Sequence, residues 1–172
     1  MDVAAFDLET LRILPGCAAP PIVCGSWCEG DREGLALDVH DRARVLLLAA
    51  GAGREIVALA NAPFDLACLA NEHVDLRRPI FDALRAGGIH DVLIAEALDA
   101  IYRGTLGLDP RTGGPLRKPS TGIETKRYSL EVVCDLVLGR IDAKVRDAWR
   151  LSYGLLRGIP IDRWPAVARE YP

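Results

Sequence analysis

The sequence lacks any long apolar run, so we do not expect a membrane-spanning helix. Its longest apolar run, Val45–Ala50, falls far short of the roughly 20 residues that cross a bilayer. A secretory signal is not expected either, because Asp2 follows Met1 directly and no basic stretch precedes the first apolar residues. We therefore expect a soluble, cytoplasmic protein with no membrane partner.

The sequence also lacks an excess of basic residues and the residue spacing of a zinc site. A net charge of −3 gives no overall attraction to nucleic acid, so contact with DNA or RNA would require a local cationic patch or metal ions. None of the five cysteines forms a Cys-x-x-Cys pair, and no histidine completes a zinc-ligand spacing. We interpret the thiols as small apolar residues in a reducing compartment.

What the sequence does contain is typical of one globular α/β domain. It has 172 residues, of which 50% are hydrophobic and 26% are charged. Short apolar segments separated by turns predict an antiparallel meander of three strands, and a longer apolar segment predicts a buried strand. The predicted strands are Val3–Leu8, Ile22–Cys28, Leu35–Asp38 and Glu55–Ala60. The predicted helices are Asp41–Ala50, a helix opened by Pro63, Pro79–Ala86, Asp91–Tyr102, Tyr128–Leu138, Ala143–Leu156 and Ile161–Glu170.

One segment is too rich in glycine and proline for a regular element. Eight of the nineteen residues in Gly104–Gly122 are Gly or Pro. The surrounding stretch Arg103–Arg127 has six basic and two acidic residues, so its net charge is +4 while the rest of the chain carries −7. We predict a flexible basic loop over residues 104–127 within a single domain spanning residues 1–172. This loop is either a site that holds a nucleic-acid backbone or simply a solvated surface.

Two carboxylates lie two residues apart on the first predicted strand. Asp7 and Glu9 would point to the same face of the sheet, where they repel each other unless a cation compensates. Hard oxygen ligands of this kind suit Mg²⁺ or Mn²⁺. The simpler alternative is that one of the two carboxylates caps a turn at the strand end, and this pair alone favours that alternative.

A second group of polar residues follows the buried strand. In Asn61-Ala-Pro-Phe-Asp65, the aspartate would lie in the first turn of a helix, near the end of the strand that neighbours Asp7. Taken separately, Asp65 is explained by the helix dipole and Asn61 by a cap or turn. That explanation does not account for their pairing with the upstream Asp7-Leu-Glu9.

These segments resemble the DEDD 3′→5′ exonucleases, which have a ribonuclease H-like fold. Ala5-Phe-Asp-Leu-Glu-Thr10 is similar to the first motif of that superfamily, and Asn61-Ala-Pro-Phe-Asp65 is similar to the second. The later segments most resemble the proofreading exonuclease domains of family A DNA polymerases. They are His90-Asp91, Tyr128-Ser-Leu-Glu before Leu138-Gly, Trp149-Arg-Leu-Ser-Tyr-Gly and Ile159-Pro-Ile-Asp-Arg-Trp-Pro.

The resemblance implies a mixed five-stranded sheet, an antiparallel meander plus parallel strands, flanked by helices. It also implies hydrolysis of phosphodiester bonds at the 3′ end of single-stranded DNA with two Mg²⁺ or Mn²⁺ ions. A polymerase domain, in cis or in trans, is an implied partner. The metal ligands would be Asp7, Glu9 and Asp65, and the substrate-binding residues would be Thr10, Asn61, Phe64, Lys126 and Arg127.

The third motif of the superfamily, Tyr-x-x-x-Asp, is matched only in part. Tyr171 would be its tyrosine and would orient the attacking water, while the partner aspartate would fall beyond Pro172. We therefore expect a chain cut close to this motif, with three of the four carboxylates present.

Two other functions are compatible with the same residues. A domain of this fold that has lost turnover could serve as a nucleic-acid-binding or scaffold module. A 3′→5′ exoribonuclease of the same superfamily would act on RNA, and no residue in the sequence indicates a preference for ribose or deoxyribose. The intact Asp7 and Glu9 favour a catalytic chain.

Overall fold

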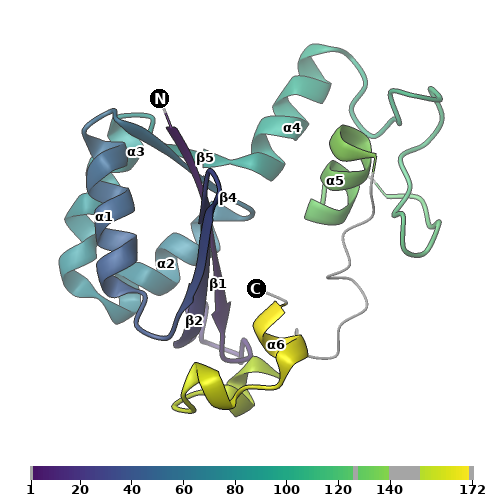
Figure 1. Ribbon diagram of the computed structural model, residues 1–172. Coiled ribbons are helices and arrows are strands. Elements are labelled where there is room, and N and C mark those ends of the chain that lie inside the picture. The colour runs from purple at the N-terminus through teal and green to yellow at the C-terminus, as the bar shows by residue number, and fades with distance from the viewer. Residues whose placement is uncertain (1, 126–127, 140–151, 171–172) are drawn as a thin grey trace. The chain divides into compact units, whose positions relative to one another are not determined.

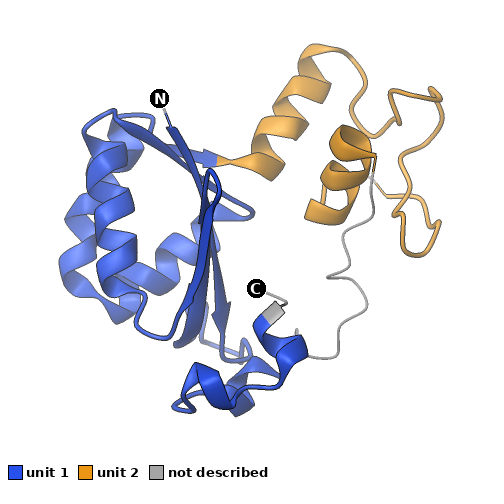
Figure 2. Cartoon of the chain, viewed as in Figure 1, with its two compact units in different colours: residues 1–90, 148–172 blue, residues 91–147 orange. Residues whose placement is uncertain are grey.

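The computed structural model describes residues 2–125, 128–139 and 152–170 (Figure 1). These residues divide into two compact units, one formed by residues 1–90 and 148–172 and the other by residues 91–147 (Figure 2). None of the helices in the described ranges is long and apolar enough to cross a membrane. The prediction that residues 1–172 act as a single exonuclease domain stays a prediction.

The first unit is built on a five-stranded mixed sheet, which confirms the predicted fold class. The order of the strands is β3-β2-β1-β4-β5. β1 pairs with β2 in antiparallel orientation and with β4 in parallel orientation, and β3 continues the antiparallel meander. The strands are β1 (Asp2–Thr10), β2 (Ile22–Glu29), β3 (Arg32–Ala36), β4 (Glu55–Leu59) and β5 (Ile89–Asp91).

The predicted strand positions need two corrections. The third strand begins at Arg32 because the turn between β2 and β3 contains only Gly30 and Asp31, with Gly30 supplying the positive φ that a two-residue hairpin turn needs. β5 was not predicted, and it ends at Asp91, where we predicted that a helix begins. Its three residues are too few to show an alternating pattern, and contact with β4 places them in the sheet, where the Val57 amide donates to the Gly88 carbonyl.

Three helices of the first unit cover one face of the sheet. They are α1 (His40–Gly51), α2 (Ala62–Glu72) and α3 (Arg77–Arg85), with a short 3₁₀ turn at Val74–Leu76. Phe6 and Leu8 point from β1 into this layer, where they pack with Leu46 of α1 and Leu69 of α2 in the larger hydrophobic core. The predicted helices around residues 41–50, 63 and 79–86 are confirmed.

The C-terminal segment packs against the opposite face of the sheet. It contains 3₁₀ turns at Tyr153–Leu156 and Ile161–Arg163, followed by the short helix α6 (Ala166–Glu170). The predicted continuous helix over residues 161–170 is therefore wrong. Pro165 disfavours the helical conformation at Trp164, whose backbone is extended at φ −72° and ψ 148°, and so the helix breaks there. The predicted helix 143–156 lies mostly outside the described residues.

The second unit contains two helices and a long connection. These helices are α4 (Val92–Tyr102) and α5 (Leu130–Leu138), both as predicted. Asp91 caps α4 by accepting hydrogen bonds from the amides of Leu93 and Ile94. The connection has no helix or strand in its described part. Two isolated bridges and the buried side chain of Leu116 organise it.

Candidate active site

Strand alternation brings Asp7 and Glu9 together on one face of the sheet. The side chains of Phe6 and Leu8 enter the larger core, so the intervening odd-numbered residues point to the opposite face. In the antiparallel register, Asp7 lies across from Ser26 and Glu9 lies across from Cys24. The predicted same-face carboxylate pair is therefore confirmed, and both carboxylates are half-buried rather than placed at a turn.

The negative charges of the two carboxylates act on the thiol of Cys24. Cys24 has no exposed surface and belongs to the core that the C-terminal segment forms with the sheet. Burial, reinforced by the negative charges of Glu9 and Asp7, raises the pKa of this thiol to about 12. The carboxylate pair thus sits beside the apolar packing of the C-terminal segment. This neighbourhood was not evident from the sequence, because it depends on the register between β1 and β2.

Asp65 reaches the same end of the sheet from another element. The parallel register pairs Ala5 with Ala58, so Asp7 lies at the level where β4 ends and the chain turns at Asn61 into α2. Asp65 is in the first turn of α2 and is only 3% exposed. A helix-dipole role requires no such burial. The neighbouring thiol of Cys68 has a pKa raised to about 11 by burial and by the charge of Asp65.

Asn61 makes the turn that places Asp65 there. It is the only non-glycine residue in the described ranges with a positive φ, at φ 72° and ψ 50°. Asparagine adopts this left-handed conformation more readily than most residues. Its side chain makes no capping hydrogen bond, whereas its carbonyl accepts one from the Phe64 amide at 3.0 Å. Asn61 therefore acts through its backbone conformation, as a turn residue and not as a side-chain cap.

The remaining predicted site residues have varied positions. Thr10 is half-buried at the end of β1, and its hydroxyl donates to the Leu11 carbonyl at 3.0 Å. Phe64 is half-buried against the larger core. Tyr171, Lys126 and Arg127 lie outside the described residues.

The described arginines of the connection in the second unit pair with carboxylates. Arg103 pairs with Asp99 at 2.9 Å, and Arg117 pairs with Glu124 at 2.9 Å. Arg111 pairs with both Asp109 at 2.9 Å and Asp135 at 2.7 Å. The positive charge of this stretch is thus partly neutralised within the second unit, which the local net charge alone did not indicate.

The donor set suits a hard divalent cation, and the sheet gathers two of its members. Asp7 and Glu9 supply carboxylate oxygens on one face, as Mg²⁺ and Mn²⁺ prefer. Within residues 2–125, 128–139 and 152–170, no three His, Cys, Asp or Glu side chains come together in a group that could hold a metal. Asp65 is therefore at the same sheet end as the pair without forming a three-ligand cluster with it.

Comparison with known proteins supports the fold. No family model matches this chain, and no curated protein matches its sequence. Among solved structures, it is similar to the EXO domain of Nibbler from Aedes aegypti, with a TM-score of 0.52 and 14% sequence identity. The match covers 93% of this chain and 68% of that one. The chain thus has the fold of that EXO domain, a ribonuclease H-like fold with a mixed five-stranded sheet.

Proposed function

We propose that this chain is a metal-dependent 3′→5′ exonuclease that hydrolyses phosphodiester bonds at the 3′ end of single-stranded DNA. The observation that carries the proposal is the placement of Asp7 and Glu9 on one face of β1, at the sheet end where α2 presents Asp65.

The residues have distinct roles in this proposal. Asp7 and Glu9 would hold the divalent ions, and Asp65 would complete the negative environment from α2. A bound Mg²⁺ or Mn²⁺ lowers the pKa of a water ligand and stabilises charge on the phosphate oxygens. Thr10, at the end of β1, would contact the terminal nucleotide, and Tyr171 would orient the attacking water through its hydroxyl.

The test is the stepwise shortening of a 5′-labelled single-stranded DNA in the presence of Mn²⁺, compared with EDTA. Asp7→Asn and Glu9→Gln are expected to reduce the rate at least about 100-fold, because several kcal/mol of charge stabilisation are lost. Glu33→Gln is the matched control, since Glu33 is an exposed strand carboxylate on β3 that the proposal does not use. Its rate should stay within about twofold of wild type.

Other results would contradict the proposal in different ways. Shortening of RNA without shortening of DNA would show an exoribonuclease and overturn the DNA assignment. If the chain bound DNA but did not shorten it in Mn²⁺, it would be a catalytically inactive nucleic-acid-binding domain. Persistence of activity in Asp7→Asn would place the catalytic centre elsewhere.

A proofreading role is the finer part of the proposal. It is supported by the resemblance of the C-terminal sequence, including Ile159-Pro-Ile-Asp-Arg-Trp-Pro, to proofreading domains. A proofreading enzyme is expected to shorten a duplex with a mispaired 3′ terminus faster than a fully paired duplex. Equal rates on the two duplexes would rule out the proofreading role, while the proposal of an exonuclease would stand.

A further inference from the structure

The C-terminal segment and the loop after β1 carry exposed arginines that are not engaged by carboxylates. Arg12, Arg163 and Arg169 are all exposed, and none of them forms an ion pair with a described acidic residue. By contrast, the neighbouring Arg157 approaches Glu72 at 3.8 Å. These three side chains therefore offer cationic charge that the described part of the molecule does not itself neutralise.

Packing places the three arginines around one small core. Leu11, Trp164 and Ala168 all pack in the hydrophobic core that contains Cys24. Arg12 directly follows Leu11, Arg163 directly precedes Trp164, and Arg169 directly follows Ala168. Because consecutive Cα atoms are only about 3.8 Å apart, each arginine backbone lies at the edge of this core.

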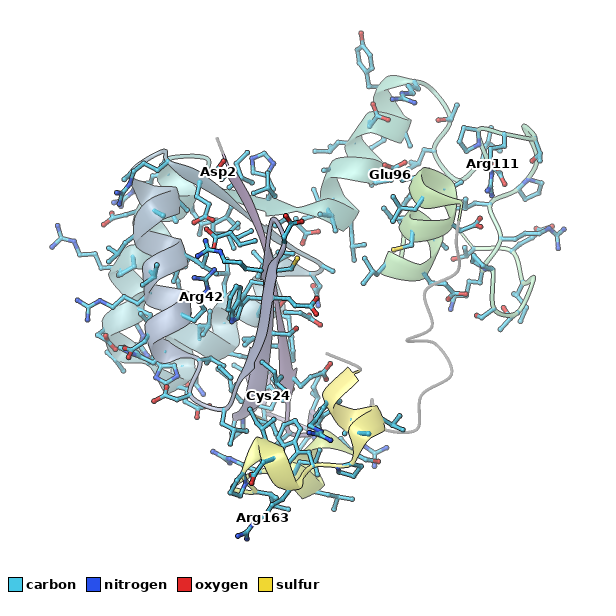
Figure 3. All side chains as sticks on the ribbon, viewed as in Figure 1. Asp2, Cys24, Arg42, Glu96, Arg111 and Arg163 are labelled. Carbon is cyan, nitrogen blue, oxygen red and sulfur yellow. The ribbon has the colours of Figure 1, made fainter. Side chains whose placement is uncertain are left out.

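Two contacts connect the elements that bear these arginines. A Cβ at Gly154 would lie 3.1 Å from the Leu11 side chain, so the loop after β1 touches the C-terminal segment directly. The Tyr153 hydroxyl donates to the Ala168 carbonyl at 2.7 Å and holds α6 against the same segment. Figure 3 shows Cys24 beside this segment, with the Arg163 side chain directed outward from it.

The same core adjoins the candidate catalytic carboxylates. Cys24 belongs to this core and lies directly across from Glu9 in the register of β1 and β2. Exposed arginines at the edge of a core that adjoins an acidic centre would match a polyanion whose terminal phosphodiester reaches the carboxylates while its other phosphates meet arginines.

We infer that Arg12, Arg163 and Arg169 hold the phosphate backbone of a single-stranded polynucleotide as it leaves the site. The inference rests on the proposed function, because it concerns the substrate of that same site. It assigns the backbone contact to the first unit, in place of the described arginines of the basic connection, which already pair with carboxylates.

The experiment measures the salt dependence of binding for a fluorescein-labelled oligothymidylate in EDTA. The variant Arg12→Gln/Arg163→Gln/Arg169→Gln is compared with Arg44→Gln/Arg54→Gln/Arg78→Gln. The second variant removes the same charge from exposed arginines of α1, the turn before β4, and α3. Thermal melting of each variant verifies that it is folded.

The first variant should flatten the slope of log K against log salt by about 2, because each lost phosphate contact on a single strand contributes about 0.7. Its affinity at moderate salt should fall at least tenfold. The control should keep the wild-type slope within about 0.5.

The inference would be overturned if the first variant kept the wild-type slope, if both variants changed equally, or if wild type bound no oligothymidylate. The proposed function has a separate outcome in the Mn²⁺ shortening assay. If the salt slope depends on the three arginines but no DNA is shortened, the exonuclease proposal is overturned and the inferred binding surface is kept. If DNA is shortened but the first variant keeps the wild-type slope, the exonuclease proposal is kept and the inferred binding surface is overturned.

Discussion

The hydroxyl of Tyr153 donates a 2.7 Å hydrogen bond to the carbonyl of Ala168, and both residues are buried. This bond joins the 3₁₀ turn that begins the C-terminal segment to the helix α6 that ends its described part. The Tyr153 ring also makes an edge contact with Trp164, at 5.9 Å between ring centroids. These two contacts hold together the segment that carries Arg163 and Arg169, and its buried Tyr153 and Trp164 pack in one core with Cys24, which lies across from Glu9 in the sheet.

Replacing Tyr153 by Phe should destabilise the chain by about 1–2 kcal/mol, because the buried Ala168 carbonyl loses its donor. We expect a lower urea midpoint and weaker oligothymidylate binding, since α6 is no longer tied down. Tyr102→Phe is the matched control, because Tyr102 is 90% exposed. If both variants unfold at the wild-type midpoint, the hydrogen bond does not hold the segment.

Replacements of Asn61 should separate backbone conformation from side-chain chemistry. Asn61→Gly is expected to keep the wild-type stability within about 0.5 kcal/mol, whereas Asn61→Val should lose about 1–2 kcal/mol, because a branched residue resists a positive φ. Urea unfolding measures both. Should Asn61→Gly retain stability but lose DNA shortening, the amide would have a direct role at the substrate.

The His40–Asp75 ion pair should make stability depend on pH. His40 Nε2 lies 2.7 Å from Asp75 Oδ2, its Nδ1 lies 3.1 Å from Asp41, and its ring meets that of His73 at 5.1 Å between centroids. The hydrogen bond that His40 donates to Asp75, followed by the one that it donates to Asp41, raises the pKa of His40 above its ordinary 6.5. The bond from His40 lowers the pKa of Asp75 below 3.8, and the positive charge of Arg44 acts in the same direction.

The pair therefore stabilises the fold at pH values between the depressed pKa of Asp75 and the elevated pKa of His40. This stabilisation is lost as pH rises through the elevated pKa of His40, and also as pH falls through the depressed pKa of Asp75. The difference in urea midpoint between wild type and Asp75→Asn should be larger at about pH 5.5 than at about pH 8.5. An equal difference at both values would mean that the pair contributes no charge-dependent stability.

Glu55 should be a destabilising residue at neutral pH. It begins β4 with only 7% of its surface exposed, and its Oε1 atom is buried without a hydrogen-bond partner among the described residues. Burial, followed by the negative charge of Glu29, raises the pKa of Glu55, although the nearby positive charge of Arg42 opposes this. Arg42 itself stacks on Trp27 and donates to Glu29 at 2.8 Å.

Glu55→Gln should raise the melting temperature at pH 7 by about 2–4 °C, because an ionised carboxylate no longer has to be buried. The gain should shrink as pH falls through the raised pKa of Glu55 toward the ordinary carboxyl value of 4.5, because the folded wild-type side chain takes up its proton above that value. A lower melting temperature in the variant would show that the attraction to Arg42 outweighs the burial.

Local sequence patterns were enough to locate the helices and strands whose own residues carry a clear pattern. Short apolar segments bounded by turns located β1 and β2, and a longer apolar segment located β4. Apolar periodicity, together with Pro63 at the start of α2, located α1 through α5. The same patterns failed where a neighbour decides the structure. β5 is a strand because β4 lies beside it, and the predicted helix 161–170 breaks because Pro165 acts on the residue before it.

The candidate site divides in the same way. Asp7 and Glu9 share a face because side chains alternate along any strand, and the sequence by itself determined that relationship. The registers of β1 with β2 and β4, by contrast, decided that Cys24 lies beside the pair and that Asp65 reaches the same sheet end. Which arginines remain unpaired was also decided by tertiary structure. Ion pairs such as Arg111 with Asp135 join residues far apart in sequence, and a local net charge carries no information about such partners.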